Sequence, residues 1–179
     1  TAQIAVQSAL TGHLVLSTLH TNTAAGAITR LEDMGVERFL ITAAVNGVLA
    51  QRLVRKLCGE CKTPVELPTD VLKSTGLAPF MSAGNQTVYE SAGCEHCKQT
   101  GYRGRMAIHE LFVLDPSAQR AVLDGADAHQ LRERARARGM RTLYEDGLHK
   151  VALGLSSLDE VLRVTQDQNE DPGDGLYAA

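Results

Sequence analysis

The stretch HLVLSTLHTNTAAGAITRLEDMG, residues 13–35, decides the fold class. Its first seven residues are mostly apolar without clean alternation, which is typical of a strand buried on both faces of a parallel sheet. A helical pattern follows and ends at Gly35, with apolar side chains on one face at Ala24, Ala27, Ile28 and Leu31. A buried strand that leads into an amphipathic helix predicts an α/β fold.

Further elements surround this stretch. Residues 2–10 place apolar side chains at helical spacing, and another helix is expected between Glu37 and the turn signal at Asn46. The segment VLAQRLVRKL, residues 48–57, follows this turn signal and is the second strand candidate. Because two strands are too few for a stable sheet, we expect the remaining strands upstream of Thr1, in a longer protein of which this chain is a fragment.

Composition limits the classes of partner. The 179 residues carry 18 Lys and Arg against 21 Asp and Glu, so the net charge of -3 gives no global field for nucleic acid or anionic lipid. The arginines of RERARARGMR, residues 132–141, and the basic residues near the cysteines are interpreted as solvated or subunit-facing surface. No apolar run reaches 18 residues and no signal peptide is recognisable, which predicts a cytoplasmic protein.

The four cysteines form two CxxC pairs, CGEC at Cys58 and Cys61 and CEHC at Cys94 and Cys97. Two residues between thiolates let both sulfurs of a pair reach one ion, and two pairs complete a tetrahedral zinc site. Four thiolates leave no open position, so we expect a structural and not a catalytic metal. Two disulfides are a weaker alternative in a cytoplasmic protein, and His96 is expected to face solvent rather than replace a cysteine.

The spacing of apolar residues changes at both ends of the cysteine region. Residues 58–105 show little periodicity, so we expect the metal, and not an apolar core, to order them. Residues that typically begin helices occur again after this region, and N-caps are predicted at Asp115, Asp127 and Ser157. The predicted parts are an α/β core segment (1–57), a tetracysteine zinc-binding module (58–105), a helical subdomain (106–165) and an acidic flexible tail (166–179).

Longer segments carry a family resemblance. In this order, TAQIAVQSALTGHLVLSTLHTN, GVLAQRLVRKLCGECK, CKQTGYRGRMAIHELF and RGMRTLYEDGLHKVALGLSSLDEVLRVT resemble the C-terminal part of the type II secretion and type IV pilus assembly ATPases, the GspE/PilB family. The resemblance covers Thr1 to about Thr165. It implies the C-terminal part of a RecA-like P-loop ATPase core, with a tetracysteine zinc module and a small helical subdomain behind it.

The resemblance also implies roles for individual residues. His20, in STLHTN, matches the family's His box and would be a catalytic group that senses the terminal phosphate of ATP. Without the family, His20 reads as an ordinary histidine at the end of a strand. Arg52, in QRL, resembles an arginine that faces nucleotide or a neighbouring subunit, with ordinary salt bridging as an equal alternative, and the same holds for Arg55.

The implied activity is incomplete in this chain. The phosphate-binding pattern GxxxxGK[ST] does not occur in it, so the chain alone is predicted to be inactive while the parent hydrolyses ATP with Mg²⁺. The resemblance implies partners as well: identical subunits in a hexameric ring, and platform proteins of the bacterial inner membrane, through which alone the motor would contact the membrane. The alternatives are a stand-alone zinc-stapled adaptor for protein or nucleic acid, and a retraction ATPase of the same superfamily.

Overall fold

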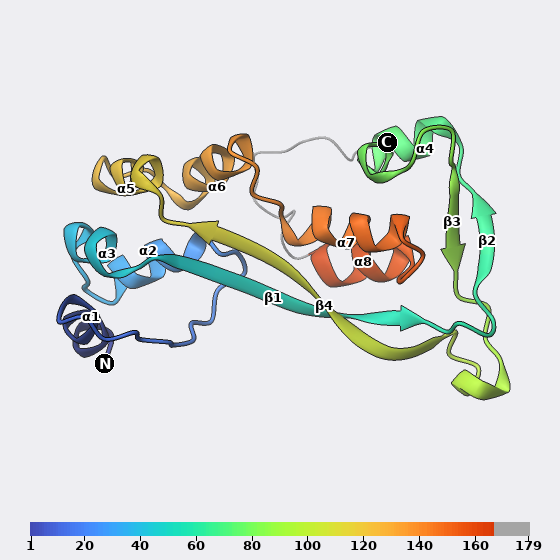
Figure 1. Cartoon of the computed structure of the whole chain (residues 1–179), viewed down its shortest axis with the longest axis horizontal. Coiled ribbons are helices and arrows are strands. Elements are labelled where there is room, and N and C mark those ends of the chain that lie inside the picture. The colour runs from blue at the N-terminus through green and yellow to red at the C-terminus, as the bar shows by residue number, and fades with distance from the viewer. Residues whose placement is uncertain (167–179) are drawn as a thin grey trace. The chain divides into compact units, whose positions relative to one another are not determined.

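The computed structural model describes residues 1–166, in which helices and strands form two compact units (Figure 1). The first unit contains Thr1–Ala50 and Glu110–Arg141, and the second contains Gln51–His109 and the described residues from Thr142 onward. Both units draw on β1 (Gly47–Leu57) and β4 (Tyr102–Val113), which pair as a two-stranded sheet. The mixed α/β class that the sequence predicts is confirmed.

The first unit is mainly helical. Its helices are α1 (Ala2–Leu10), α2 (Gly26–Asp33), α3 (Arg38–Ala44), α5 (Pro116–Leu123) and α6 (Ala128–Ala137). They surround a core in which Ile28, Ile41, Phe112 and Leu131 are almost completely buried. The helices predicted around residues 2–10, 24–35 and 37–45 are therefore present.

Side-chain caps fix where the later helices begin. The Asp115 carboxylate accepts hydrogen bonds from the backbone N–H groups of Ser117 and Ala118, both at 2.9 Å, and Pro116 occupies the first turn. The Asp127 carboxylate accepts from Gln130 N–H at 2.7 Å. Both caps satisfy N–H groups that have no partner inside the helix, as the sequence predicts.

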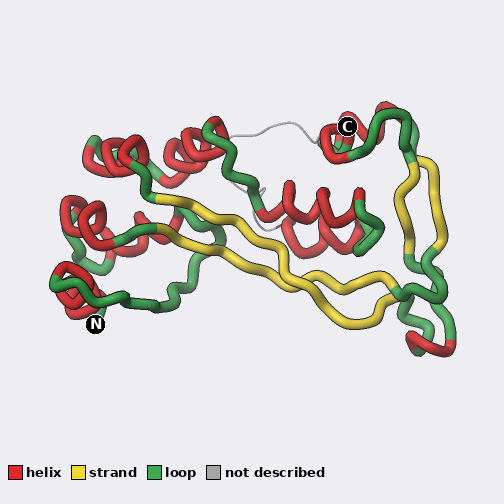
Figure 2. The backbone as a smooth tube through the Cα atoms, in the orientation of Figure 1, coloured by secondary structure: helices red, strands yellow, loops and turns green. Residues whose placement is uncertain are grey.

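The strand predicted at residues 13–19 is not formed. These residues follow α1 as an extended loop (Figure 2), and Leu14 and Leu16 are 83% and 87% exposed. A strand requires a neighbour for its N–H and C=O groups, and within residues 1–166 this segment pairs with no other strand. The predicted parallel sheet is likewise absent from the described residues, where the sheets are β1 with β4 and β2 with β3.

The second unit combines a two-stranded antiparallel sheet with a helix pair. Its remaining elements are β2 (Thr63–Glu66), α4 (Thr69–Ser74), the 3₁₀ turn η1 (Ala78–Phe80), β3 (Thr87–Glu90), the 3₁₀ turn η2 (Glu95–Cys97), α7 (Leu143–Ala152) and α8 (Leu158–Thr165). Strands β2 and β3 pair antiparallel, with Thr63 opposite Glu90 and Glu66 opposite Thr87. Ser157 caps α8 by accepting from Glu160 N–H at 3.2 Å, which confirms the third predicted cap.

The segment between the two CxxC pairs, residues 62–93, contributes to an apolar core. Leu72, Leu77 and Val88 are buried in one cluster with Leu148 and Val161 from α7 and α8. The expectation that the metal alone orders residues 58–105 is therefore wrong for the middle of this region. These apolar side chains are too widely spaced to form a periodic pattern in the sequence. In the structure they pack together against α7 and α8.

The two compact units divide the chain at other positions than the predicted parts do. Helices α5 and α6 pack in the first unit, whereas α7 and α8 pack in the second, so the helices predicted for one subdomain are divided between two units. The predicted boundaries themselves stay predictions. Of the acidic tail predicted at residues 166–179, all but Gln166 lies outside the described residues. Among the helices of residues 1–166, none combines the length and apolarity of a membrane span.

Candidate functional site

The four cysteines meet at one end of the second unit. Cys58 follows β1 and Cys61 lies three residues further on, while Cys94 immediately precedes η2 and Cys97 is its last residue. All four sulfur atoms lie within 4.8 Å of one another, and none is in a disulfide. The sequence prediction that both CxxC pairs converge is confirmed.

The sulfur spacing fits a zinc tetrahedron. The Sγ–Sγ distances are 4.0 Å for Cys58 and Cys94, and 3.8 Å for Cys97 with both Cys61 and Cys94. Four thiolates at the usual Zn–S distance of about 2.3 Å would lie about 3.8 Å apart. A disulfide would need sulfurs about 2.05 Å apart, so this cluster matches a metal site and not two crosslinks.

Backbone groups hold the second pair in place. The N–H groups of Cys94 and Gly101 donate to Cys97 Sγ at 3.2 and 3.1 Å, and Cys58 N–H donates to Gly101 C=O at 2.9 Å. Gly101 has φ +73°, and a Cβ there would lie 2.4 Å from the Ser91 side chain. Glycine at position 101 therefore allows the chain to close tightly around the sulfur cluster.

The local electrostatics favour a bound cation. Burial opposes ionisation of Cys97, but the N–H groups of Cys94 and Gly101 outweigh it and lower the pKa of this thiol to about 6. Burial, together with the neighbouring sulfurs, raises the pKa of Cys61 to about 12. Ionisation of one thiol thus disfavours ionisation of its neighbour, because two thiolates repel each other. A bound divalent cation compensates this repulsion. The donor set and its spacing fit zinc.

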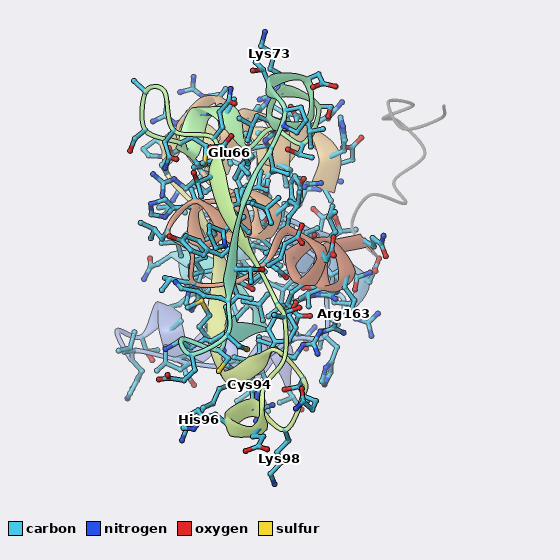
Figure 3. The ribbon with its side chains drawn as sticks, turned by 90° about the vertical axis from the view of Figure 1, so that its right-hand side faces the viewer. Glu66, Lys73, Cys94, His96, Lys98 and Arg163 are labelled. Carbon is cyan, nitrogen blue, oxygen red and sulfur yellow. The ribbon has the colours of Figure 1, made fainter. Side chains whose placement is uncertain are left out.

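His96 is not part of the sulfur cluster. Its ring is exposed and contacts the Arg103 guanidinium. Figure 3 shows the His96 and Lys98 side chains extending outward at the tip that carries Cys94. The prediction that His96 faces solvent is confirmed.

A buried carboxylate ties α8 to β1. Glu160, fully buried, accepts from Arg55 Nη2 at 2.7 Å, from Arg163 Nη2 at 2.8 Å and from Arg55 N–H at 3.0 Å. The Arg55 guanidinium also stacks 4.0 Å from the centre of the Tyr102 ring, whose hydroxyl lies 2.7 Å from Ser157 Oγ. Arg55 is thus a salt-bridging residue in this unit. The predicted cap at Ser157 lies three residues before Glu160, but no local pattern in the sequence indicates the arginine partners of this carboxylate.

The second unit should lose stability in acid because of Glu160. Burial disfavours its charge, but Arg163 and Arg55 outweigh burial and lower the pKa from 4.5 to about 2. A depressed carboxyl pKa stabilises the folded state fully above pH 4.5, and this stabilisation is lost as the pH falls towards 2. We expect Glu160→Gln to show a smaller loss of melting temperature across this range than the unchanged protein. Metal release in acid affects both proteins alike, so equal losses in the two would contradict this role of Glu160.

His20 and Arg52 belong to different compact units. His20 is exposed in the loop before α2, and its imidazole makes no hydrogen bond or ion pair within residues 1–166. Arg52 is half-buried on β1, where its guanidinium donates to Val164 C=O at 3.0 Å. The structure thus brings the cysteines together and gives Arg52 a partner in its own unit. The nucleotide roles of His20 and Arg52 stay predictions.

Comparison with known proteins decides the family. The model of the family described as Type II/IV secretion system protein matches residues 1–163. The chain belongs to this family. It is 52% identical to the type IV pilus assembly ATPase PilB of Thermus thermophilus over 92% of its length, and 48% identical to the type II secretion system ATPase E of Vibrio cholerae over 93%.

This member of the type II/IV secretion family spans 18% of the Thermus relative and 32% of the Vibrio relative. Its fold resembles a crystal structure of the pilus retraction motor PilT with bound ADP, with a TM-score of 0.59. That match covers 94% of this chain and 37% of PilT at 21% identity, and so supports the shared ATPase fold alone. The GspE/PilB resemblance is confirmed.

Proposed function

We propose that this chain is part of an ATPase that powers type II secretion or type IV pilus assembly. The observation that carries the proposal is the family match over residues 1–163, together with relatives near 50% identity that bear these names. Family membership favours this motor over a stand-alone zinc-stapled adaptor. The proposed assembly is a hexameric ring at the cytoplasmic face of the inner membrane, in contact with platform proteins of the secretion or pilus apparatus.

In this proposal Cys58, Cys61, Cys94 and Cys97 hold one structural zinc ion. The ion would join the end of β1 to the turn before β4, and its closed coordination leaves no place for a substrate. ATP hydrolysis would therefore take place elsewhere in the motor. The zinc-bound tip, residues 58–62 and 91–101, would instead contact partner proteins during assembly.

His20 would act at the nucleotide in the same motor. An imidazole can donate a hydrogen bond to a terminal phosphate oxygen or orient the attacking water, and its ring is exposed for such contact. Water attacks the terminal phosphorus, the bond to the bridging oxygen breaks, and ADP leaves. Arg52 is proposed to contact nucleotide only if its bond to Val164 opens. The phosphate-binding loop and the Mg²⁺ ligands would come from other parts of the full-length protein.

Phosphate release from ATP tests the proposal. We expect the full-length protein to release phosphate only with Mg²⁺ present, and this chain alone to release none, because it contains no GxxxxGK[ST] pattern. Chelation of Mg²⁺ with EDTA, followed by restoration with excess Mg²⁺, serves as the control. A full-length protein without Mg²⁺-dependent turnover in its assembled state would contradict the proposal.

A further inference from the structure

Glu110 is a buried carboxylate that the proposed site does not use. It lies on β4, on the same buried face as Ile108 and Phe112, and none of its surface is exposed. Its Oε1 accepts a hydrogen bond from the Ala24 backbone N–H at 2.8 Å, and its Oε2 has no partner within residues 1–166. A buried carboxyl group with one unpaired oxygen destabilises the folded state. If position 110 served packing alone, an apolar side chain there would give a more stable protein.

The bond from Glu110 reaches the entrance of α2. Ala24 precedes this helix by two residues, where N–H groups have no partner inside the helix and a negative charge is favourable. Ala24 and Ala25 are completely buried, so water cannot replace the carboxylate. Glu110 thus closes a contact between segments that are 86 positions apart.

Local bonds make the chain from residue 21 to residue 26 a single turn. Thr21 Oγ1 donates to Thr23 C=O at 3.0 Å, and Gly26 N–H donates to Thr23 Oγ1 at 3.1 Å. These bonds lie within the turn, and the buried Ala24 and Ala25 pack it into the core of the first unit. Packing of two small methyl groups is not directional, so the hydrogen bond from Ala24 N–H to Glu110 is the contact that fixes the register of the turn against β4.

His20 is joined directly to this turn and has no hydrogen bond of its own from its ring within the described residues. Its position therefore depends on where residues 21–26 are held. We propose that Glu110 is a positioning residue: through Ala24 it fixes the turn that follows His20 and so places His20 for ATP hydrolysis. This inference rests on the role proposed for His20 above.

Three substitutions in the full-length protein separate the bond from the charge. Glu110→Gln keeps an oxygen that can accept from Ala24 N–H, so kcat should stay within about twofold of the original. Glu110→Ala removes the acceptor, and Glu110→Asp withdraws it by one methylene. Both should lower kcat by about 10- to 100-fold, with KM for ATP within about twofold, because misplacement of a reacting group affects the chemical step. If Glu110→Ala fails to fold, the Asp and Gln variants decide the question.

A matched control excludes a simple loss of packing. Phe112→Leu removes volume on the same face of β4 without touching the bond to Ala24. It should lower the melting temperature while kcat stays within about twofold. Amide exchange at residues 21–28 should become faster in Glu110→Ala and Glu110→Asp, and should keep its original rate in Glu110→Gln and Phe112→Leu.

A double-mutant cycle with His20→Ala tests whether Glu110 acts through His20. In that background Glu110→Ala should lower kcat by less than about twofold, since the group that it positions is gone. Full additivity of the two losses, an unchanged kcat in Glu110→Ala, or an equal loss in Phe112→Leu would overturn the inference alone. An unchanged kcat in His20→Ala would instead overturn the proposed role of His20, and this inference with it.

Discussion

Removal of the metal by a chelator, or substitution of Cys94 by Ser, should unfold the tip formed by residues 58–62 and 91–101. A structural zinc ion contributes on the order of 10 kcal/mol at neutral pH, far more than the few contacts of this tip. The antiparallel strand pair β2–β3 and helix α4 should persist, because Leu72 and Val88 pack against α7 and α8. Amide exchange resolved by segment is the appropriate measurement.

His96→Ser is the matched control for that experiment. It lies between Cys94 and Cys97 in sequence, is exposed and lies outside the sulfur cluster, so it should retain metal and the original exchange pattern. Unchanged protection of residues 91–101 after complete loss of metal would show that zinc does not hold this tip.

Substitution of His20 by Ala in the full-length protein should lower kcat for ATP roughly 100-fold. The imidazole would act on charge that develops at the terminal phosphate, so the loss should fall on kcat while KM for ATP stays within about twofold. Steady-state phosphate release over a range of ATP concentrations separates the two constants.

His13→Ala is the control for His20. Both histidines are exposed and flank the same loop, but the His13 ring lies within hydrogen-bond distance of Thr11, at 3.1 Å, and has no proposed contact with nucleotide. We expect kcat of this variant to stay close to the original. Equal losses in both variants would indicate damage to the loop, and no loss in His20→Ala would make it an ordinary loop histidine.

Local signals in the sequence predicted the metal site and the helix starts. Cys58 and Cys94 are far apart in sequence, yet CxxC spacing limits each pair to a shared ion, so convergence followed from chemistry alone. Asp115 and Asp127 cap their helices through bonds that span two or three residues, which a short window of sequence contains in full.

Features that depend on distant partners were missed. Residues 13–19 have the composition of a buried strand, but a strand also needs a paired neighbour, and composition does not supply one. Strand β4 was not predicted because the buried Glu110 breaks the alternation of apolar residues between Ile108 and Phe112. The carboxylate of Glu160 binds arginines over a separation of 105 positions as well as nearby, and no local pattern indicates the distant partner.

X-ray absorption at the zinc edge, combined with elemental analysis of freshly purified, reduced protein, tests the central claim about the site most directly. The account predicts one zinc ion per chain with four sulfur ligands at about 2.3 Å, from Cys58, Cys61, Cys94 and Cys97. Protein without metal, together with the mass loss of two disulfides, would contradict it.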